Sequence, residues 1–201
     1  MKLSAKDQKF LNLVKHTAQA EAELEKGRLF FEKQDWDTAI ACFTEAIRLD
    51  PDYALAYNNR GFSKHRLGDQ YLRAIEDYDR AIGLDPNDAR IYFNRGYSWS
   101  RLGQNNTAIK NYDKAIELLP DHAWAYINRG RCYQELRQYQ QSIEDYSKAL
   151  RLEPNYARAY IGRSVSYYRL GQNELAVEDC DKAIELDPNS ETAYINRGYS
   201  Y

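Results

Sequence analysis

The chain repeats itself at an interval of 34 residues, and this period restricts the folds that it can adopt. The string AYINRG occupies residues 125–130 and occurs again, unchanged, at residues 193–198. Related strings begin at residues 56, 91 and 159, so the successive steps are 35, 34, 34 and 34. The five prolines follow the same steps: they are Pro51, Pro86, Pro120, Pro154 and Pro188. A period of this length is typical of an array of stacked units, each in contact with its neighbours.

Each unit has the hydrophobic pattern of two helices. In residues 89–122, Tyr92, Gly96 and Trp99 follow a spacing of four and three, which marks one face of a helix. After a turn at residues 103–105, a second apolar stripe runs through residues 108–116. A proline and an aspartate then favour a helix end and a turn. Each unit is therefore predicted to be two antiparallel helices of about 13 residues, joined by short loops.

Small residues recur at the same places and predict close contact between helices. Positions are counted so that the proline of each unit stands at position thirty-two. Glycine costs a helix roughly 1 kcal/mol relative to alanine, so its recurrence inside a helix needs a packing reason. Position eight holds Gly27, Gly61, Gly96, Gly130, Ser164 and Gly198, and position twenty holds Ala39, Ala74, Ala108, Ser142 and Ala176. Position twenty-seven is alanine in five units, and aromatic rings recur at positions four and twenty-four.

This pattern resembles the tetratricopeptide repeat family, whose motif combines these small, aromatic and proline positions. The resemblance covers residues 20–201, and it implies an all-α fold, a right-handed superhelical solenoid of antiparallel helix pairs. We expect complete repeats at residues 20–53, 54–88, 89–122, 123–156 and 157–190, with one inserted residue in the second. Residues 191–201 would form the first helix of a sixth, incomplete repeat. In residues 1–19, Leu3, Phe10, Leu11 and Val14 predict a helix that caps the first repeat or extends its first helix.

Position seven departs from the family, in which leucine is usual. It holds Lys26, Arg60, Arg95, Arg129, Arg163 and Arg197. Aspartate stands at position twenty-three in three of the units with arginine, as Asp77, Asp145 and Asp179. We therefore predict an arginine–aspartate bridge between the two helices of a repeat. If the bridge is buried, loss of one partner costs about 3–5 kcal/mol, whereas a solvated pair is worth less than about 1 kcal/mol.

Composition and charge argue against several classes of function. The net charge of −2 gives no general reason to expect binding to nucleic acid or to an anionic membrane, and no apolar run approaches the length of a membrane span. We expect a cytoplasmic protein without cofactors. Cys42, Cys132 and Cys180 are too widely spaced for a zinc motif and are predicted to be small core residues. The histidines are scattered and no phosphate-binding glycine loop occurs, so we expect no enzyme and no metal site.

The resemblance implies that the first helices line a concave groove that binds peptides. Positions two, five, six, nine, twelve and thirteen lie opposite the core stripe of these helices. At these positions a slightly acidic chain concentrates arginine and aromatic residues, both of which are frequent at binding hot spots. The expected partner is an extended, acidic peptide. The predicted groove residues are Asn59, Phe62, Arg66, Arg90, Phe93, Asn94, Tyr97, Arg101, Trp124, Asn128, Arg131, Arg158, Tyr168, Arg169 and Asn196.

Asparagine recurs at position six, as Asn59, Asn94, Asn128 and Asn196. An amide both donates and accepts hydrogen bonds, so this row can bind the backbone of a peptide. It is similar to the asparagine ladder in the repeat domain of O-linked N-acetylglucosamine transferase. The alternative is that these amides serve local helix packing. The lysine–asparagine clamp of chaperone-binding members is matched only in part, because both lysines are replaced, so no chaperone terminus is predicted as a ligand.

Three other interpretations stay open. The exposed apolar residues of the last helix predict self-association into a homo-oligomer. Stacking of bases on the arginine–aromatic groove predicts single-stranded RNA, although the balanced charge argues against it. The chain is also interpretable as the repeat portion of a larger multidomain protein.

Overall fold

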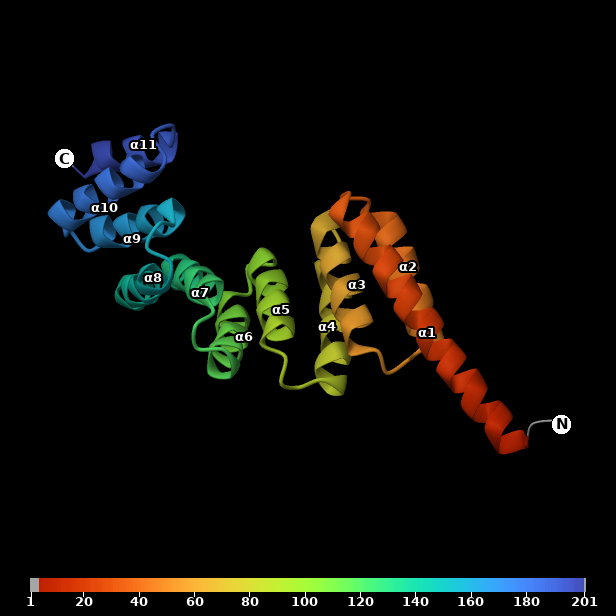
Figure 1. Ribbon diagram of the computed structural model, residues 1–201. Coiled ribbons are helices and arrows are strands. Elements are labelled where there is room, and N and C mark those ends of the chain that lie inside the picture. Colours follow the sequence, from red (N-terminus) through yellow and green to blue (C-terminus); the bar gives the residue numbers. More distant parts are fainter. Residues whose placement is uncertain (1–3, 201) are drawn as a thin grey trace. The chain divides into compact units, whose positions relative to one another are not determined.

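The computed structural model describes residues 4–200, and within them the side chains of Ser4 and of residues 14–200. This described part consists of helices and turns, without a strand, so the predicted all-α fold class is confirmed. The helices follow one another as antiparallel pairs in chain order (Figure 1). They are α1 (Ala5–Glu32), α2 (Trp36–Leu49), α3 (Ala54–Leu67), α4 (Tyr71–Leu84), α5 (Ala89–Arg101), α6 (Asn105–Leu118), α7 (Ala123–Glu135), α8 (Tyr139–Leu152), α9 (Ala157–Arg169), α10 (Asn173–Leu186) and α11 (Glu191–Tyr199).

The chain forms two compact units, one ending at Ser98 and one beginning at Trp99. In the first unit α1 packs on α2, α2 on α3 and α3 on α4. In the second unit each helix from α6 to α10 packs on the helix that follows it in the chain. First helices also touch one another directly: α1 contacts α3, α7 contacts α9 and α9 contacts α11. Within each unit the first helices therefore lie side by side.

The first helix is longer than those of the other repeats. Residues 5–32 form a single helix, so the segment before residue 20 continues the first helix of the first repeat. Val14 on this extension is half exposed. Leu3, Phe10 and Leu11, which the sequence suggested for an apolar side, lie outside the described side chains.

The turns follow the chemistry of their residues. Gly68, Gly103 and Gly171 close the turn inside a repeat with φ of 85°, 73° and 72°, a left-handed conformation that glycine adopts without strain. In the fourth repeat Arg137 takes this conformation, with φ of 59°. The inserted residue of the second repeat lies in this turn, since α4 begins three residues after Gly68 whereas α6 begins two residues after Gly103.

The small residues bring the helices together as predicted. A Cβ added at Gly27 would lie 2.5 Å from the Phe43 ring, and one at Gly61 would lie 2.9 Å from the Tyr78 ring. At Gly198 an added Cβ would meet no atom within 4 Å, so the packing reason does not extend to this residue. Position twenty is fully buried in every complete repeat, and the residues at position twenty-four fill the space beside it: Phe43, Tyr78, Tyr112, Tyr146 and Cys180.

The predicted arginine–aspartate bridges are present and join the two helices of a repeat. Arg60, Arg129 and Arg163 each hold both carboxylate oxygens of their aspartate, at distances of 2.6 to 3.0 Å. The partners Asp77, Asp145 and Asp179 are buried. Burial alone would lower the pKa of Arg129, but hydrogen bonds and charges from Asp145 and Asp113 outweigh it and raise the pKa above its usual value. The bridges are thus buried ion pairs with bidentate geometry.

The same arginines also reach back to the preceding repeat. In five repeats the second guanidinium branch donates to a residue sixteen positions earlier, on the second helix of the repeat before. The five pairs are Arg60–Thr44, Arg95–Asp79, Arg129–Asp113, Arg163–Ser147 and Arg197–Asp181. The tyrosine at position four stacks against each guanidinium, 5.3 to 5.6 Å from ring centre to carbon. Position seven therefore holds consecutive repeats in register.

Candidate functional site

The described cavities lie at equivalent places, where one repeat meets the next. We call them junction pockets. The pocket between the third and fourth repeats has a volume of about 280 Å³. The pocket between the fourth and fifth repeats has a volume of about 450 Å³. The first is lined by Ser100, Arg101, Gly103, Asn105, Arg131 and Glu135, and the second by Gln134, Glu135, Arg137, Tyr139, Val165 and Arg169. Each residue of the second set stands 34 positions after its counterpart in the first.

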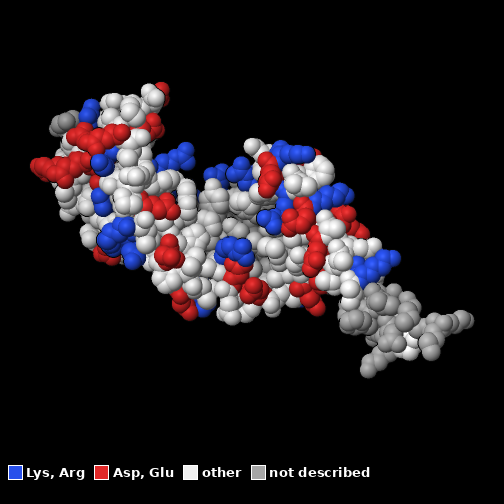
Figure 2. Space-filling view, in the orientation of Figure 1, with Lys and Arg blue, Asp and Glu red and all other residues white. Residues whose placement is uncertain are grey.

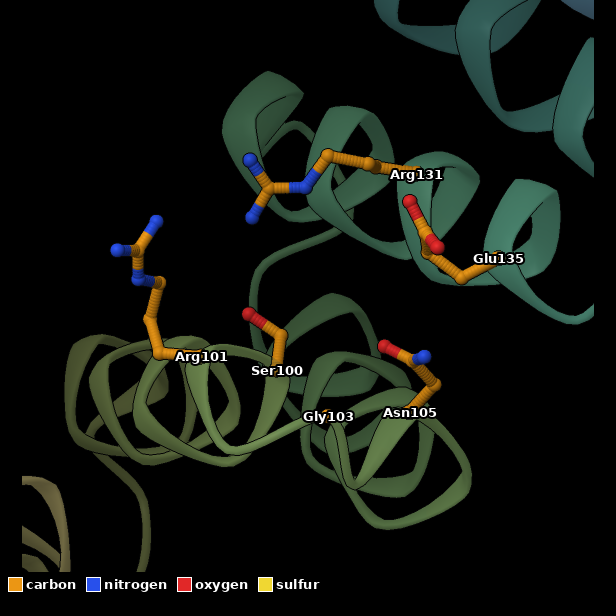
Figure 3. A pocket seen from close by; sticks show the side chains of 6 residues that line it. All are labelled: Ser100, Arg101, Gly103, Asn105, Arg131 and Glu135. Carbon is orange, nitrogen blue, oxygen red and sulfur yellow. The ribbon is translucent and has the colours of Figure 1, made fainter.

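Two arginines dominate the pocket between the third and fourth repeats (Figure 3). Arg101 extends from the end of α5 and Arg131 from α7, and their guanidinium groups face the same space, toward which the Ser100 hydroxyl also points. Asn105, in the first turn of α6, and Glu135, at the end of α7, form the other side. The start of α6 adds the positive end of a helix dipole. With two cations and one carboxylate, the pocket favours an anionic group.

The pocket between the fifth and sixth repeats has an apolar character. It has a volume of about 160 Å³. Val165, Tyr168 and Tyr199 supply its apolar lining, and the polar lining residues are Ser164, Arg169, Asn196 and Ser200. Tyr168 is 40% exposed and Tyr199 is 68% exposed. Large aromatic side chains that stay exposed beside a cavity can bury their faces against an apolar side chain of a partner.

The first unit has an aromatic counterpart, between the first and second repeats. This cavity of about 270 Å³ is lined by Arg28, Phe31, Glu32, Phe43, Asn59 and Phe62. The Phe31 and Phe62 rings lie 5.4 Å apart, and ring contacts continue through His65 to Tyr97 at 4.6 Å. At the next junction His65 is itself buried and its Nδ1 lies 2.8 Å from the Ser98 hydroxyl. Phe31 and Phe62 therefore offer apolar surface, and Asn59 beside them offers an amide.

Family models match most of the chain. The model described as TPR repeat matches residues 27–68, 69–99, 101–137 and 165–201. The model described as Tetratricopeptide repeat matches residues 123–156. The chain belongs to the tetratricopeptide repeat (TPR) family.

Solved structures agree with this TPR fold. The crystal structure of MamA protein is 25% identical, with a TM-score of 0.75, over 85% of this chain and 92% of that chain. The structure of YrrB, described as a TPR protein with an unusual peptide-binding site, is 21% identical, with a TM-score of 0.74, over 88% of this chain and 90% of that chain. Stress-induced-phosphoprotein 1 of Caenorhabditis elegans is 37% identical over 60 residues, 30% of this chain. Those residues are 18% of that protein, so the chain matches less than a fifth of its length.

The residues predicted for the TPR groove fall into three groups by exposure. Only Asn128 is buried. The half-buried group is Asn59, Phe62, Phe93, Asn94, Tyr97 and Asn196. The exposed group is Arg66, Arg90, Arg101, Trp124, Arg131, Arg158, Tyr168 and Arg169. Seven of the fifteen line a junction pocket, namely Asn59, Phe62, Arg101, Arg131, Tyr168, Arg169 and Asn196.

Three predicted residues have local roles in the structure. Arg90 holds Asp88, two positions before it, through its guanidinium at 2.6 to 3.1 Å. Arg66 stacks on the Trp36 ring, 5.2 Å from its centre. Trp124 lies edge-on to Tyr156 at 4.8 Å. These contacts hold each side chain against a neighbour in the same repeat or in the preceding one.

The asparagine row is mixed in its local bonding. The amide of Asn128 donates to the Trp124 carbonyl of its own helix at 2.8 Å, and the amide of Asn94 donates to Asn58 at 3.0 Å. For these two donors the structure shows helix packing, the alternative that the sequence left open. Asn59 and Asn196 instead line pockets. The prediction that asparagines bind a peptide backbone therefore rests chiefly on these two.

Gly162 interrupts the asparagine row for a packing reason. A Cβ at this residue would lie 2.4 Å from the Tyr146 ring. The phenol of Tyr146 donates to Gln134, whose amide in turn donates to the Gly162 carbonyl at 2.6 Å and to the Ser166 hydroxyl at 2.8 Å. The fourth and fifth repeats are therefore joined by this polar network at the place where four of the other five repeats carry asparagine.

Several pocket residues were missed from the sequence. Ser100, Gln134 and Val165 stand at positions nine and twelve, which were assigned to the groove, but they are neither arginine nor aromatic. Gly103, Asn105, Arg137 and Tyr139 belong to the turn and to the start of the second helix, which were not assigned to the groove at all. Their equal spacing of 34 residues was the available signal.

Other kinds of site find no support among the described residues. In this part of the chain no three histidine, cysteine, aspartate or glutamate side chains come together as metal ligands. The three cysteines are free and buried, as predicted for core residues. No described helix combines the length and apolar character that a membrane span requires.

Proposed function

We propose that this TPR protein is a non-catalytic scaffold that binds an extended, acidic segment of another protein along its first helices. The TPR fold is typical of protein–protein interaction, and the distribution of charge indicates the partner. Helices α3, α5, α7 and α9 carry eleven lysines and arginines and a single acid, Glu135. Helices α4, α6, α8 and α10 carry twelve acids and seven cations. Charge is thus divided between the first and the second helices of the repeats, although the whole chain is slightly acidic.

The pair of arginines in the pocket between the third and fourth repeats is the observation that carries this proposal. Part of the positive charge of the first helices is used internally, in the bridges at position seven. Arg101 and Arg131 line a cavity and their guanidinium groups face it, so a carboxylate in this cavity can receive charge-assisted hydrogen bonds from them. Acidic side chains gather elsewhere, over α10 and α11 (Figure 2), where Glu174, Glu178 and Glu191 are exposed. In the same unit, Asn196 would bind the backbone of the segment, as in an asparagine ladder.

Binding of labelled peptides tests the proposal. Fluorescence anisotropy should show that an acidic, extended peptide binds and that its glutamine-substituted counterpart does not. The affinity for the acidic peptide should fall as the salt concentration rises. The double substitution Arg101→Gln and Arg131→Gln should weaken binding more than tenfold, because two charge-assisted contacts are lost. Arg151→Gln is the matched control, since Arg151 is an exposed arginine on the second helix α8. Equal affinity for both peptides, or equal effects of the two variants, would refute the proposal, and tight binding of a single-stranded oligonucleotide instead would favour RNA.

A cytoplasmic location is part of this proposal. Free cysteines in the core suit a reducing compartment, where thiols do not pair. Cell fractionation of the tagged protein would test it, and recovery in an oxidising compartment would contradict it.

Self-association is a second candidate function, favoured by one surface of α11. Tyr194, Ile195 and Tyr199 are 45%, 54% and 68% exposed on this helix. Light scattering after size exclusion should then show a mass that rises above 23.5 kDa with concentration, and Tyr199→Glu should restore the monomer mass. A constant mass across the series would exclude this function.

A further inference from the structure

The three junction pockets of the second unit form a continuous series. The pocket of Arg101 and Arg131 shares Glu135 with the next pocket. That pocket in turn shares Val165 and Arg169 with the pocket of Tyr168 and Tyr199. Adjacent pockets therefore have a common wall. A segment that fills the first pocket passes the second before it reaches the third.

The distance between neighbouring pockets follows from the helices that bear them. Directly packed helices lie about 8–10 Å apart, and α7 contacts α9, which contacts α11. An extended chain in the polyproline II conformation has three residues per turn and rises about 3.1 Å per residue, so one turn advances by about 9 Å. Side chains three residues apart then lie on the same face and meet successive pockets. Two pockets that are separated by one other receive side chains six residues apart.

The two outer pockets differ in chemistry although they stand at equivalent places. At position nine the first pocket has Arg131 where the third has Tyr199, and at position twelve it has Ser100 where the third has Tyr168. The first pocket offers two guanidinium groups, a hydroxyl and an amide beside the single carboxylate of Glu135, and this excess of cations suits a carboxylate of the ligand. The third offers two phenol rings and the Val165 side chain, which suit an aliphatic or aromatic side chain. The middle pocket also has two arginines and a carboxylate, but Tyr139 and Val165 stand where the first pocket has Asn105 and Arg131, so it combines charged and apolar walls and has no single preference.

We infer that residues 99–200 bind an extended segment in which every third side chain faces a pocket, and in which an acidic side chain and a large apolar side chain stand six positions apart. This inference rests on the proposed function, because it takes the segment to lie along the first helices. It adds the sequence pattern that the partner must carry. The acid occupies the pocket of Arg101 and Arg131, and the apolar side chain occupies the pocket of Tyr168 and Tyr199.

Peptides of fixed composition test the spacing. Fluorescein-labelled peptides on a proline- and alanine-rich background should carry one glutamate and one leucine, with the leucine four, five, six or eight positions from the glutamate, in both orders. Spacing six in one of the two orders should bind about tenfold more tightly than spacing five or eight, because only that spacing fills both pockets. Replacing the glutamate by glutamine, or the leucine by serine, should each remove about tenfold in affinity.

Variants that borrow residues from equivalent repeats test each pocket separately. Arg131→Val introduces the side chain of the equivalent residue in the next repeat, Val165. This variant should lose the preference for glutamate over glutamine and keep the preference for leucine over serine. Tyr168→Gln introduces the side chain of the equivalent residue in the preceding repeat, Gln134. This variant should lose the preference for leucine over serine and keep the preference for glutamate over glutamine. Arg151→Gln should change neither preference. If a variant does not fold, as judged by circular dichroism, the substitutions in the peptide still decide the question.

The outcomes separate this inference from the proposed function. If acidic peptides bind and the arginine variants weaken them, but every spacing binds equally, the inference is wrong and the proposed function stands. If Arg131→Val and Tyr168→Gln reduce both preferences alike, the assignment of the pockets is wrong. If no acidic peptide binds at any spacing, the proposed function fails and the inference fails with it.

Discussion

At the scale of single residues, Arg129 explains why a charge replaces the leucine that is usual at position seven of this family. Its guanidinium holds Asp145 in its own repeat and Asp113 in the preceding one, and its carbon lies 5.5 Å from the Tyr126 ring centre. Burial raises the pKa of Asp145, against the effect of Arg129, so the carboxylate is desolvated and depends on its partner. Burial of this kind makes loss of one partner costly, whereas loss of both is not.

Removal of Asp145 alone should therefore destabilise the protein strongly. Asp145→Ala is expected to lower the free energy of unfolding by about 3–5 kcal/mol, because Arg129 keeps a charge in a largely buried place. Urea denaturation followed by circular dichroism measures the change. Glu144→Ala, an exposed neighbour on α8, should stay within about 0.5 kcal/mol of the parent. The pair Arg129→Met with Asp145→Leu should recover most of the loss, and an Asp145→Ala curve equal to the parent would show that the bridge contributes nothing.

Gly162 and Gly83 should respond in opposite directions to an added side chain. Gly162→Asn would complete the asparagine row, but its Cβ would lie 2.4 Å from the Tyr146 ring, so we expect a loss of about 1–3 kcal/mol from overpacking. Gly83 lies in α4 and an added Cβ there meets no atom within 4 Å, so Gly83→Ala should stabilise by about 0.5–1 kcal/mol. Thermal melts of the two variants measure both effects. A Gly162→Asn variant as stable as the parent would mean that Tyr146 moves aside without cost.

At the scale of helices, the position-seven arginines tie each first helix to the repeat before it. In helix α11 this contact has few others beside it. The helix packs only on α10 and α9 among the described helices, and Tyr194, Ile195 and Tyr199 are exposed to solvent. Arg197 reaches Asp181 on α10 at 2.7 Å, with both side chains partly exposed. Exposed pairs are worth less than about 1 kcal/mol, so the tie is a local one.

Loss of this contact should loosen α11 and leave the remaining helices unchanged. Arg197→Gln is expected to speed amide hydrogen exchange in α11 by up to about fivefold, with no change in α7 or α8. Hydrogen exchange resolved by mass spectrometry would measure it. Lys182→Gln, which removes a helix-surface pair with Glu185, should not affect α11. Faster exchange throughout residues 99–200 would instead show that the array responds as a single cooperative unit.

At the scale of the whole molecule, the cores of both units are built largely of buried alanines, aromatic rings and thiols. Cys42 belongs to the first unit, and Cys132 and Cys180 belong to the second. All three are buried, and burial raises the pKa of Cys132 to about 11 and raises the pKa of the other two thiols as well. Reactive thiolate is therefore scarce in the folded protein at neutral pH.

We expect that none of the three thiols reacts with a thiol reagent in the native state and that all three react once the chain unfolds. At pH 8 we expect labelling by a maleimide or a disulfide reagent to follow the urea unfolding curve, because a buried thiol with a raised pKa reacts through opening of its surroundings. Mass spectrometry of labelled peptides would assign each site. Rapid native labelling of Cys132 would contradict its burial.

The sequence by itself determined the repeat, the helix pairs and the pairing of arginine with aspartate. These follow from periodic patterns, since a 34-residue period places equivalent side chains in equivalent surroundings and a helical stripe places residues three and four apart on one face. Gly27 and Gly61 were correctly assigned to close helix contacts for this reason.

Only the tertiary structure decided where the cavities lie and which side chains face them. A junction pocket takes residues from the end of one repeat, from its inner turn and from the first helix of the next, as Arg101, Asn105 and Arg131 show. Helical phase cannot predict this grouping, because it depends on how two repeats pack. The same holds for Asn128, whose amide turns to its own helix, and for Gly162, where the Tyr146 ring leaves no room for a side chain. Periodicity specifies faces, whereas packing between repeats specifies the spaces in those faces that a partner can fill.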